Sequence, residues 1–359
     1  MITIHMTTHR RFASGLLRRA VASVLAQDYT DFEFVICDDA STDGSADYLA
    51  GVAARDPRVK VIRNPRNVNS VAISLGRCMQ AADPARRWVS WMFDDCILRP
   101  GALSRLARAV AVGGEVKMVF GVTEVLAPDG APPLRVGAAP PEEIRRGVAN
   151  SSILVPNGGI LIDRAVFERV GWYDPSIVLR RSCDWDLFRR IIGAGVPFVT
   201  LPDVLMEEHG ALQSDSLRNA FTTSFDLMQR YCAARDAAGL PLDLANCLAM
   251  PVDWIPPGFW TSDEMALMQY MFVEYFLSVG DVPRAFHWAR RLEEALPRPS
   301  LMRENLLRRA TVRDPAAGEE ESGPDPMAAG AYAALVFSAY GQHLAERQAA
   351  AAPAQGLAA

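Results

Sequence analysis

The sequence predicts an α/β fold, a mainly parallel sheet flanked by helices, followed by an α-helical C-terminal subdomain. Strand-like and helix-like segments alternate with short connections over roughly the first hundred residues, which is typical of a doubly wound sheet. Residues 32–37 are apolar at most positions, as expected for a strand that is covered on both faces. From about residue 214, long helical patterns replace the alternation.

Hydrophobic periodicity places the individual elements along the first two hundred residues. Strands are expected at residues 2–6, 32–37, 59–62, 88–93, 116–125, 158–163 and 197–201. Helices are expected at residues 12–25, 45–55, 70–82, 164–170 and 183–193. Residues 38–45 combine turn formers with N-cap candidates before the second of these helices. Residues 128–141 are rich in Pro, Gly and Ala and are expected to form a loop.

The change of pattern predicts the domain organisation. We expect one α/β domain over residues 1–213 and a helical subdomain over 214–312. The expected remainder is a flexible linker at 313–326, a terminal helix at 327–348 and a low-complexity tail at 349–359. Met and aromatic residues between 265 and 276 recur at helical spacing, which indicates a core face or a homodimer interface of the C-terminal helices.

Composition excludes several classes of protein. The 359 residues carry a formal net charge of −5, so no basic excess points to nucleic acid. No apolar run approaches the roughly 20 residues of a membrane-spanning helix, so no integral membrane segment is expected. Six scattered cysteines without a CxxC pair suit free thiols in a reducing compartment. A cytoplasmic protein is therefore predicted.

Two acidic clusters follow two of the predicted strands. Asp38 and Asp39 end residues 32–37, and Asp94 and Asp95 follow 88–93. Ligands of such sheets bind beyond the carboxyl ends of the strands. Adjacent carboxylates can cap a helix, pair with arginines or bind a hard divalent cation, and for an isolated pair the first two explanations prevail. Two clusters at one edge would repel each other unless a cation or hydrogen-bond donors offset them, which favours a site for a metal and a phosphate ligand.

Three motifs around these clusters resemble those of family 2 glycosyltransferases, which have the GT-A fold. Residues 34–45 read FVICDDASTDGS and are similar to that family's Asp-Asp-Gly-Ser-Thr-Asp-Gly-Ser signature. Residues 4–10, IHMTTHR, resemble its first strand and turn, and residues 27–33, QDYTDFE, resemble the segment before its second strand. The resemblance is specific over the first 45 residues and weaker to about residue 215. It implies a nucleotide-sugar-binding half at 1–100 and an acceptor half at 101–213.

The resemblance implies which residues lie near the nucleotide. By position these are Thr7, His9, Arg10, Asn67 and Asp94, and either Asp38 or Asp39 is expected to bind the base. A structural turn cap is the alternative for both aspartates. Residues 64–70, NPRNVNS, depart from the family's pattern, because Asn69 replaces a glycine and the arginine expected near residue 74 is missing. Arg77 lies about one turn further and is either a substitute or a solvated arginine of the helix face.

The stretch MFDDCILRPG at residues 92–101 falls where the family has its metal-binding Asp-x-Asp motif. With Pro100 as the anchor, Asp95 takes the position of the final carboxylate, and Phe93 replaces the first aspartate. His209 stands where relatives have a histidine that contacts the metal or diphosphate, although a lone histidine is as often structural. The resemblance thus implies that Asp95 and His209 hold Mn²⁺ or Mg²⁺.

Residues 182–190, SCDWDLFRR, resemble the family's Glu-Asp-x-Glu-Leu-x-x-Arg segment, with Cys183 in place of the first Glu. Asp184 then matches the catalytic base, which an inverting transfer needs within reach of the acceptor hydroxyl. The alternative is that Asp184 only stabilises the helix N-terminus. Further residues are expected on the acceptor side. Gly158 and Gly159 match the family's small-residue loop, Trp172 stands in its aromatic turn, and Asp186 follows Asp184 in the same segment.

The resemblance implies an inverting, metal-dependent glycosyltransferase. Its donor would be a UDP-, GDP- or dTDP-linked sugar, and its acceptor a sugar or another hydroxyl compound. A catalytically degenerate protein that binds sugar nucleotides or partners is the alternative, because Phe93, Asn69 and Cys183 depart from the pattern. A nucleotidyltransferase is disfavoured, because residues 7–12 contain no glycine for a phosphate-binding loop.

Overall fold

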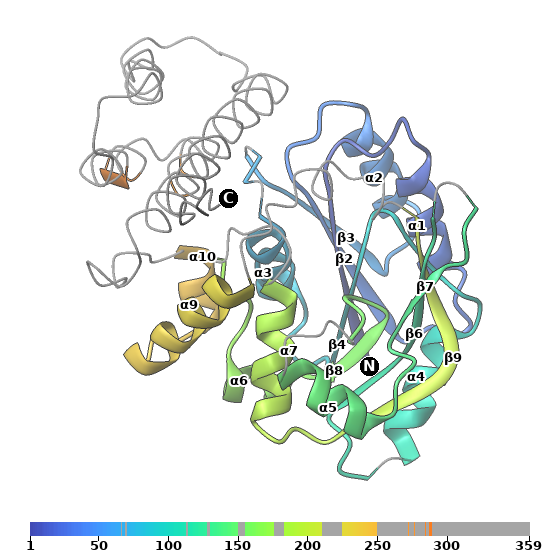
Figure 1. Ribbon diagram of the computed structural model, residues 1–359. Coiled ribbons are helices and arrows are strands. Elements are labelled where there is room, and N and C mark those ends of the chain that lie inside the picture. Colours follow the sequence, from blue (N-terminus) through green and yellow to red (C-terminus); the bar gives the residue numbers. More distant parts are fainter. Residues whose placement is uncertain are drawn as a thin grey trace, which may run out of the picture. The chain divides into compact units, whose positions relative to one another are not determined.

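Nine strands in the described part of the chain form one sheet. They are β1 (Ile2–Thr8), β2 (Phe32–Asp38), β3 (Val59–Arg63), β4 (Trp88–Phe93), β5 (Cys96–Leu98), β6 (Met118–Val125), β7 (Leu134–Val136), β8 (Ile160–Asp163) and β9 (Phe198–Glu208). Their order is β3-β2-β1-β4-β8-β6-β9-β5, with β7 paired to β6 (Figure 1). Strands β3, β2, β1 and β4 are parallel, whereas the other half mixes parallel β6–β9 pairing with antiparallel pairs.

This description rests on a computed structural model. It describes residues 1–65, 67–68, 70–112, 114–127, 130–149, 155–175, 183–209 and 225–249, together with Phe272, Phe276, Arg284, His287 and Trp288. The chain divides into two compact units, Met1–Glu264 and Met265–Ala359. In the second unit, the rings of Phe272 and Trp288 pack 4.8 Å apart and both are buried.

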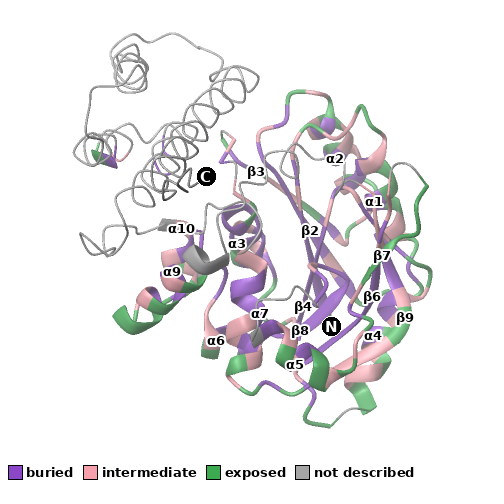
Figure 2. Ribbon diagram, viewed as in Figure 1, coloured by how far each residue is buried: buried purple, intermediate pink, exposed green. Residues whose placement is uncertain are grey.

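Helices cover both faces of the sheet in the first unit. They are α1 (Leu16–Leu25), α2 (Ser45–Ala53), α3 (Val71–Ala81), α4 (Ala102–Val112), α5 (Pro141–Ala149), α6 (Arg164–Val170), α7 (Cys183–Gly193), α9 (Phe225–Ala238) and α10 (Leu244–Ala249). Apolar side chains of α1, α2 and α4 pack on one face, and those of α3, α5, α6 and α7 pack on the other. Figure 2 shows the resulting pattern, with buried strands between half-exposed helices.

The alternation of side chains along the strands explains the two cores. In β8, Leu161 belongs to the core under α1, α2 and α4, whereas Ile160 and Ile162 belong to the opposite core. Successive residues of a strand point to opposite faces, so an apolar run serves both cores. This is why the continuous apolar segments of the sequence were correct predictors of central strands.

Several elements differ from the predicted ones. Helix α1 begins at Leu16 rather than near residue 12, because Gly15 precedes it with a left-handed φ of 73°. Strands β5 and β7 were not predicted, since three residues are too few to show a period, and β7 lies inside the expected loop. Strand β9 continues from the predicted 197–201 to Glu208, although its pairing with β6 is irregular beside Gly121.

Helices α4, α5 and α10 were also not predicted individually, and α9 corresponds to the end of the long helical pattern after residue 214. Helix α10 packs on α3 within the first unit. The expected linker at 313–326, the helix at 327–348 and the tail at 349–359 lie outside the described residues, so these expectations stay predictions. The Met and aromatic stripe at 265–276 is described only at Phe272 and Phe276, which are buried.

Within the described ranges, none of the helices combines the length and the apolar character that crossing a bilayer requires.

His5 is a histidine inside the sheet whose pKa is strongly lowered. It lies in the middle of β1, fully buried, with Nε2 3.1 Å from Thr3 Oγ1. Burial, assisted by the positive charge of Arg164, lowers the pKa of His5 to about 3. The folded protein therefore keeps this imidazole neutral, while an unfolded chain would protonate it near pH 6.5.

We expect replacement of His5 to flatten the acid side of the stability curve. Folding lowers this pKa, so the folded protein loses stability relative to the unfolded chain when the unfolded chain binds a proton at His5. This loss of stability is absent near pH 8 and grows as the pH falls below about 6.5. Between pH 8 and pH 5, the wild type should lose about 2 kcal/mol of unfolding free energy more than His5→Gln does. Urea denaturation of both proteins at the two pH values measures this difference. Equal losses in the two proteins would contradict the assignment.

Candidate active site at the ends of strands β1, β2 and β4

Three parallel strands bring the predicted nucleotide residues to one edge of the sheet. Thr8 pairs with Asp38 of β2, and Thr7 pairs with Phe93 of β4, so the three strands end side by side. The turns that follow these strands carry His9, Asp39 and the Asp94–Asp95 pair. The parallel arrangement inferred from the sequence is therefore what gathers both acidic clusters.

Asp94 is a buried carboxylate next to a second negative charge. Its Oδ2 accepts hydrogen bonds from Thr8 Oγ1 at 2.7 Å and from the backbone N–H of His9 at 3.4 Å. Arg11 lies between the pair, with Nε 3.6 Å from Asp94 Oδ1 and Nη2 3.9 Å from Asp95 Oδ2. Burial and the charge of Asp95 still raise the pKa of Asp94 to about 7, against the opposing effects of Thr8 and Arg11. This edge therefore carries more negative charge than its protein partners compensate.

His209 lies beside Asp95 at the end of β9. Its backbone N–H donates to the carbonyl oxygen of Asp95 at 2.9 Å, because β5 and β9 pair through Cys96 and Glu208. The imidazole Nε2 is 3.0 Å from Glu207 Oε2 and 3.4 Å from Arg19 Nη2. Residues that are far apart in the sequence thus meet as the resemblance implied. Among the described residues, however, no group of three His, Cys, Asp or Glu side chains is gathered as a metal cluster.

Asp38 and Asp39 have different environments. Asp38 Oδ1 accepts from the backbone N–H of Ser41 at 3.0 Å, and its Oδ2 lies 3.3 Å from Arg63 Nε. Asp38 thus takes part in the turn, as the alternative explanation held. Asp39 Oδ1 accepts from Asn64 Nδ2 at 2.7 Å and from the Val68 N–H at 2.8 Å. These bonds fix the orientation of the Asp39 carboxylate.

The predicted residues of the first turn surround Asp39. His9 Nδ1 lies 2.7 Å from the Asp39 carbonyl oxygen, and His9 Nε2 lies 3.1 Å from Asn67 Nδ2. Arg10 has a left-handed φ of 54°, and its N–H donates to Ser41 Oγ at 3.0 Å. The His9 ring is therefore held between the turns after β2 and β3, beside the base-binding candidate.

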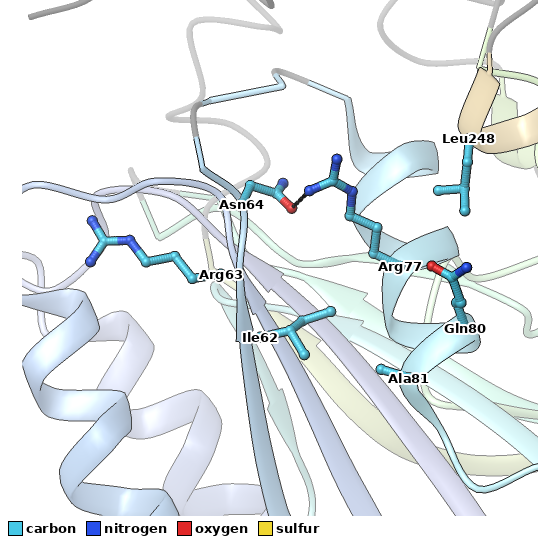
Figure 3. Close-up of a pocket in the computed structure, with 7 residues that line it drawn as sticks. All are labelled: Ile62, Arg63, Asn64, Arg77, Gln80, Ala81 and Leu248. Atoms are coloured by element: carbon cyan, nitrogen blue, oxygen red, sulfur yellow. Dashed lines mark hydrogen bonds between the residues drawn. The ribbon is translucent and has the colours of Figure 1, made fainter.

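Arg77 is half-buried, and its guanidinium is turned toward the residue that follows β3. Its Nη1 donates to Asn64 Oδ1, and Figure 3 shows the guanidinium turned toward that amide. The two side chains line an open pocket of about 420 Å³ with five further residues: Ile62, Arg63, Gln80, Ala81 and Leu248. Asn64 Nδ2 also lies 3.2 Å from Ser74 Oγ, at the position where the family's arginine is missing. Arg77 thus reaches Asp39 indirectly, through Asn64.

Asn64 and Arg11 are site residues that the sequence reasoning missed. Asn64 directly follows β3 at the same sheet edge, so the strand-end rule that singled out the aspartates could have found it. Arg11 carried no comparable signal, because its contact with Asp94 depends on the path of the turn after β1.

Asp184 stands in the first turn of α7, half-buried, and its Oδ1 accepts from the Trp185 N–H at 2.9 Å. Burial raises the pKa values of Tyr173 and Cys183, and the negative charge of Asp184 adds to this effect. Tyr173 is linked in turn to the sheet, because its hydroxyl donates to Asn157 Oδ1, which also accepts from Trp91 Nε1 of β4. The N-terminus of α7 thereby connects with the strand that leads to Asp94.

The two predicted acceptor-side glycines have a packing reason. A Cβ at Gly158 would lie 3.1 Å from the Trp91 carbonyl oxygen, and Gly159 has a φ of 60° while its N–H donates to that same oxygen. Both residues are buried. They let the chain approach β4 closely, so their glycine identity follows from the fold without an acceptor.

Trp172 and Asp186 also have environments other than the expected one. Trp172 is 2 % exposed, and its ring packs 4.7 Å from that of Phe167, so it is a core residue and offers no open face to a sugar. Asp186 is fully buried and paired with Arg189, Arg190 and Arg235. The expectation that these two side chains lie on the acceptor side is therefore not supported, because neither reaches the surface.

Comparison with known proteins decides the family. Residues 3–170 match the family described as "Glycosyl transferase family 2". This part of the chain belongs to that family. The chain is 26% identical over 212 residues to "Putative glycosyltransferase EpsE" of Bacillus subtilis (strain 168), which covers 58% of this chain and 73% of that protein. It is 50% identical over 52 residues to "Succinoglycan biosynthesis protein ExoW" of Rhizobium meliloti (strain 1021). That match covers 14% of this chain and 16% of the relative.

The fold of this glycosyltransferase is also found among solved structures. The structure of S. aureus TarS 1-349 in complex with UDP-GlcNAc matches it with a TM-score of 0.52 at 13% identity, over 82% of this chain and 90% of that chain. An identity this low shows the fold alone. The predicted GT-A fold and the predicted membership in glycosyltransferase family 2 are confirmed.

We expect Asn64→Ala to destabilise the glycosyltransferase domain by about 2–4 kcal/mol, because it removes buried hydrogen bonds to Asp39 and Ser74 and leaves the guanidinium of Arg77 without this acceptor. Urea denaturation measures the loss. The control is Asn67→Ala at a half-buried position, which should lose no more than about 1 kcal/mol. Equal losses in the two variants would contradict the central place given to Asn64.

Proposed function

We propose that this glycosyltransferase transfers a sugar, with inversion, from a nucleoside-diphosphate sugar to an acceptor hydroxyl and depends on a divalent cation. One observation carries the proposal. Buried Asp94 and half-buried Asp95 lie at the same sheet edge as the oriented Asp39 carboxylate, within the part of the chain that belongs to the family. One acidic site suits a cation that accompanies phosphates, and the other suits a base or ribose.

The residues at the end of β4 fit Mn²⁺ or Mg²⁺. The available donors are carboxylate oxygens of Asp95 and Asp94 and the imidazole of His209, and hard cations at phosphate sites take one or two carboxylates with substrate phosphates as further ligands. Burial and, after it, the charge of Asp95 raise the pKa of Asp94, and a cation would offset the repulsion between the two carboxylates. When bound, the cation would neutralise and polarise the leaving diphosphate.

The first turn and the Asp39 carboxylate supply the proposed nucleotide contacts. Asp39 can accept a hydrogen bond from an N–H group of the base, because Asn64 and Val68 hold its orientation. Thr7 lies near the end of β1, and His9 and Arg10 follow that strand at the same edge. UDP-, GDP- and dTDP-linked sugars are the proposed donor class. UDP-GlcNAc is the first to test, since it was bound in a structure of the same fold.

Asp184 is the proposed general base. It stands half-buried at the N-terminus of α7, where a carboxylate can accept the proton of an acceptor hydroxyl as the oxygen attacks the anomeric carbon. Attack from the face opposite the leaving nucleotide inverts the configuration. A degenerate, non-catalytic protein is the second candidate, favoured by the apolar Phe93 where the metal motif has its first aspartate. A cytoplasmic location and a homodimer through the C-terminal helices stay predictions from the sequence.

We expect Asp95→Ala to abolish stabilisation by metal and nucleotide together. Mn²⁺ with UDP should raise the melting temperature of the wild type, since a ligand at 100 times its Kd stabilises by about 2.7 kcal/mol. EDTA should reverse the shift, and metal-dependent nucleotide release in Asp95→Ala should fall by about 100-fold or more. The control is Asp31→Ala, next to the opposite end of β2. A wild-type shift and activity in Asp95→Ala would contradict the metal site.

We expect Asp184→Asn to lower kcat by about 100- to 10,000-fold, because an amide cannot take up the acceptor's proton. The KM for the donor should change little, since Asp184 is not among the donor contacts. Nucleotide release from the best donor of the panel measures both constants. Asp203→Asn, at an exposed ion pair of β9, is the control. If Asp184→Asn keeps the wild-type kcat, this residue is not the base.

A further inference from the structure

A buried guanidinium joins helix α9 to the proposed catalytic helix α7, which lies beside it in Figure 1. Arg235 Nη1 donates to Asp174 Oδ2 at 2.9 Å and to Asp186 Oδ2 at 2.8 Å, and its Nη2 donates to Asp186 Oδ1 at 2.9 Å. The side chains of all three residues are at most 1% exposed. Arg235 lies beyond the residues that match the family, 3–170.

Three arginines, Arg235 included, meet three aspartates in this cluster, because Asp236 is paired with Arg235 at 2.7 Å and with Arg189 at 2.8 Å. Asp186 is also paired with Arg189 at 2.9 Å and Arg190 at 3.0 Å. Burial opposes ionisation, but these arginines outweigh it and hold the pKa of Asp186 well below its usual range. Asp174 accepts a further hydrogen bond from Tyr231 of α9 at 3.1 Å. Asp186 is therefore a permanently charged anchor for the guanidinium, and Asp174 is a second acceptor that two residues of α9 hold in place.

The two anchors belong to the segments that flank the proposed base. Asp186 is in the first turns of α7, two residues after Asp184, and Asp174 ends the turn that begins at Gly171. Arg190 strengthens the same junction, because its guanidinium donates to the carbonyl oxygens of Val170 and Trp172. The start of α7 is thus tied to the preceding turn from two sides.

Stability alone does not account for such a junction. Buried ion pairs contribute little compared with apolar residues of the same volume, because both charges lose their hydration. What a planar guanidinium adds is direction, since its paired N–H groups fix where two carboxylates lie. The same arrangement leaves the first turn of α7 little freedom to shift.

We propose that Arg235 is a positioning residue for Asp184: it joins Asp174 to Asp186 and thereby holds the first turn of α7 where Asp184 meets the acceptor. The inference rests on the proposed function, because it requires Asp184 to be the base. It assigns a role in the reaction to α9, which lies outside the matched family residues. A small displacement of a catalytic group lowers the rate of the chemical step more than it lowers substrate binding.

Donor hydrolysis with water as the acceptor tests this role without knowledge of the natural acceptor. The assay uses the UDP-, GDP- or dTDP-sugar that the wild type hydrolyses fastest, at a temperature where circular dichroism shows each variant folded. We expect Arg235→Met to lower kcat by about 100-fold, with the KM for the donor within about twofold of the wild type. Arg235→Lys should be intermediate, because an ammonium lacks the planar fork. Tyr231→Phe keeps the guanidinium junction and should retain the wild-type kcat.

Arg235→Met leaves two buried carboxylates with fewer partners and could therefore unfold the protein. A second variant separates that effect from the loss of positioning. Arg235→Met with Asp174→Asn removes one of these charges and should show the same loss of kcat. A wild-type kcat in either folded variant, or equal losses in kcat and donor affinity, would overturn the inference. Asp184→Asn separates the two proposals. If Asp184→Asn keeps the wild-type hydrolysis rate, the proposed base is wrong. If Asp184→Asn loses activity and Arg235→Met keeps the wild-type rate, only the positioning role is wrong.

Discussion

Like charge at one sheet edge is the constraint on which the site depends. Parallel pairing of β1 with both β2 and β4 brings two acidic clusters together. The protein compensates them unequally. Asp39 receives hydrogen bonds from an amide and a backbone N–H, and Asp38 has an arginine. Asp94 receives hydrogen bonds from the Thr8 hydroxyl and the His9 N–H, but it lies beside a second carboxylate, and the pair shares Arg11 at more than 3.5 Å. The least compensated pair is the one that the resemblance assigns to the metal and diphosphate, which is where a charged ligand contributes most.

The half of the fold that carries this edge could be predicted from the sequence, because its strands are long apolar runs and its turns carry strong formers. The strand-end rule then located the acidic clusters without any tertiary information. The second half was less predictable for a physical reason. Strands β5 and β7 have three residues each, and β5 also depends on β9, a partner far along the chain. A period cannot be read from so few residues.

The position of the site residues was likewise easier to predict than their burial. The sequence indicates which side chains lie at a strand end, but burial is decided by residues brought in from elsewhere. The sequence placed Asp186 on the acceptor side, but Arg235 of α9 packs against it in the interior. Trp172 likewise lies in an aromatic cluster with Trp91 and Phe167. Local patterns therefore identified candidate chemistry, while only the packing showed which carboxylate remains partly exposed.

Strand β9 has a consequence for protein engineering. It runs beside β6 along most of its length and pairs with β5 only at its end, where His209 meets Asp95. Because side chains alternate along a strand, a one-residue deletion within β9 before its pairing with β5 would turn that end over and move His209 away from Asp95. A chimaera that exchanges segments with a related enzyme should therefore move β5, β6 and β9 as one block. A crossover point within that block could shift the register between paired strands that come from different enzymes.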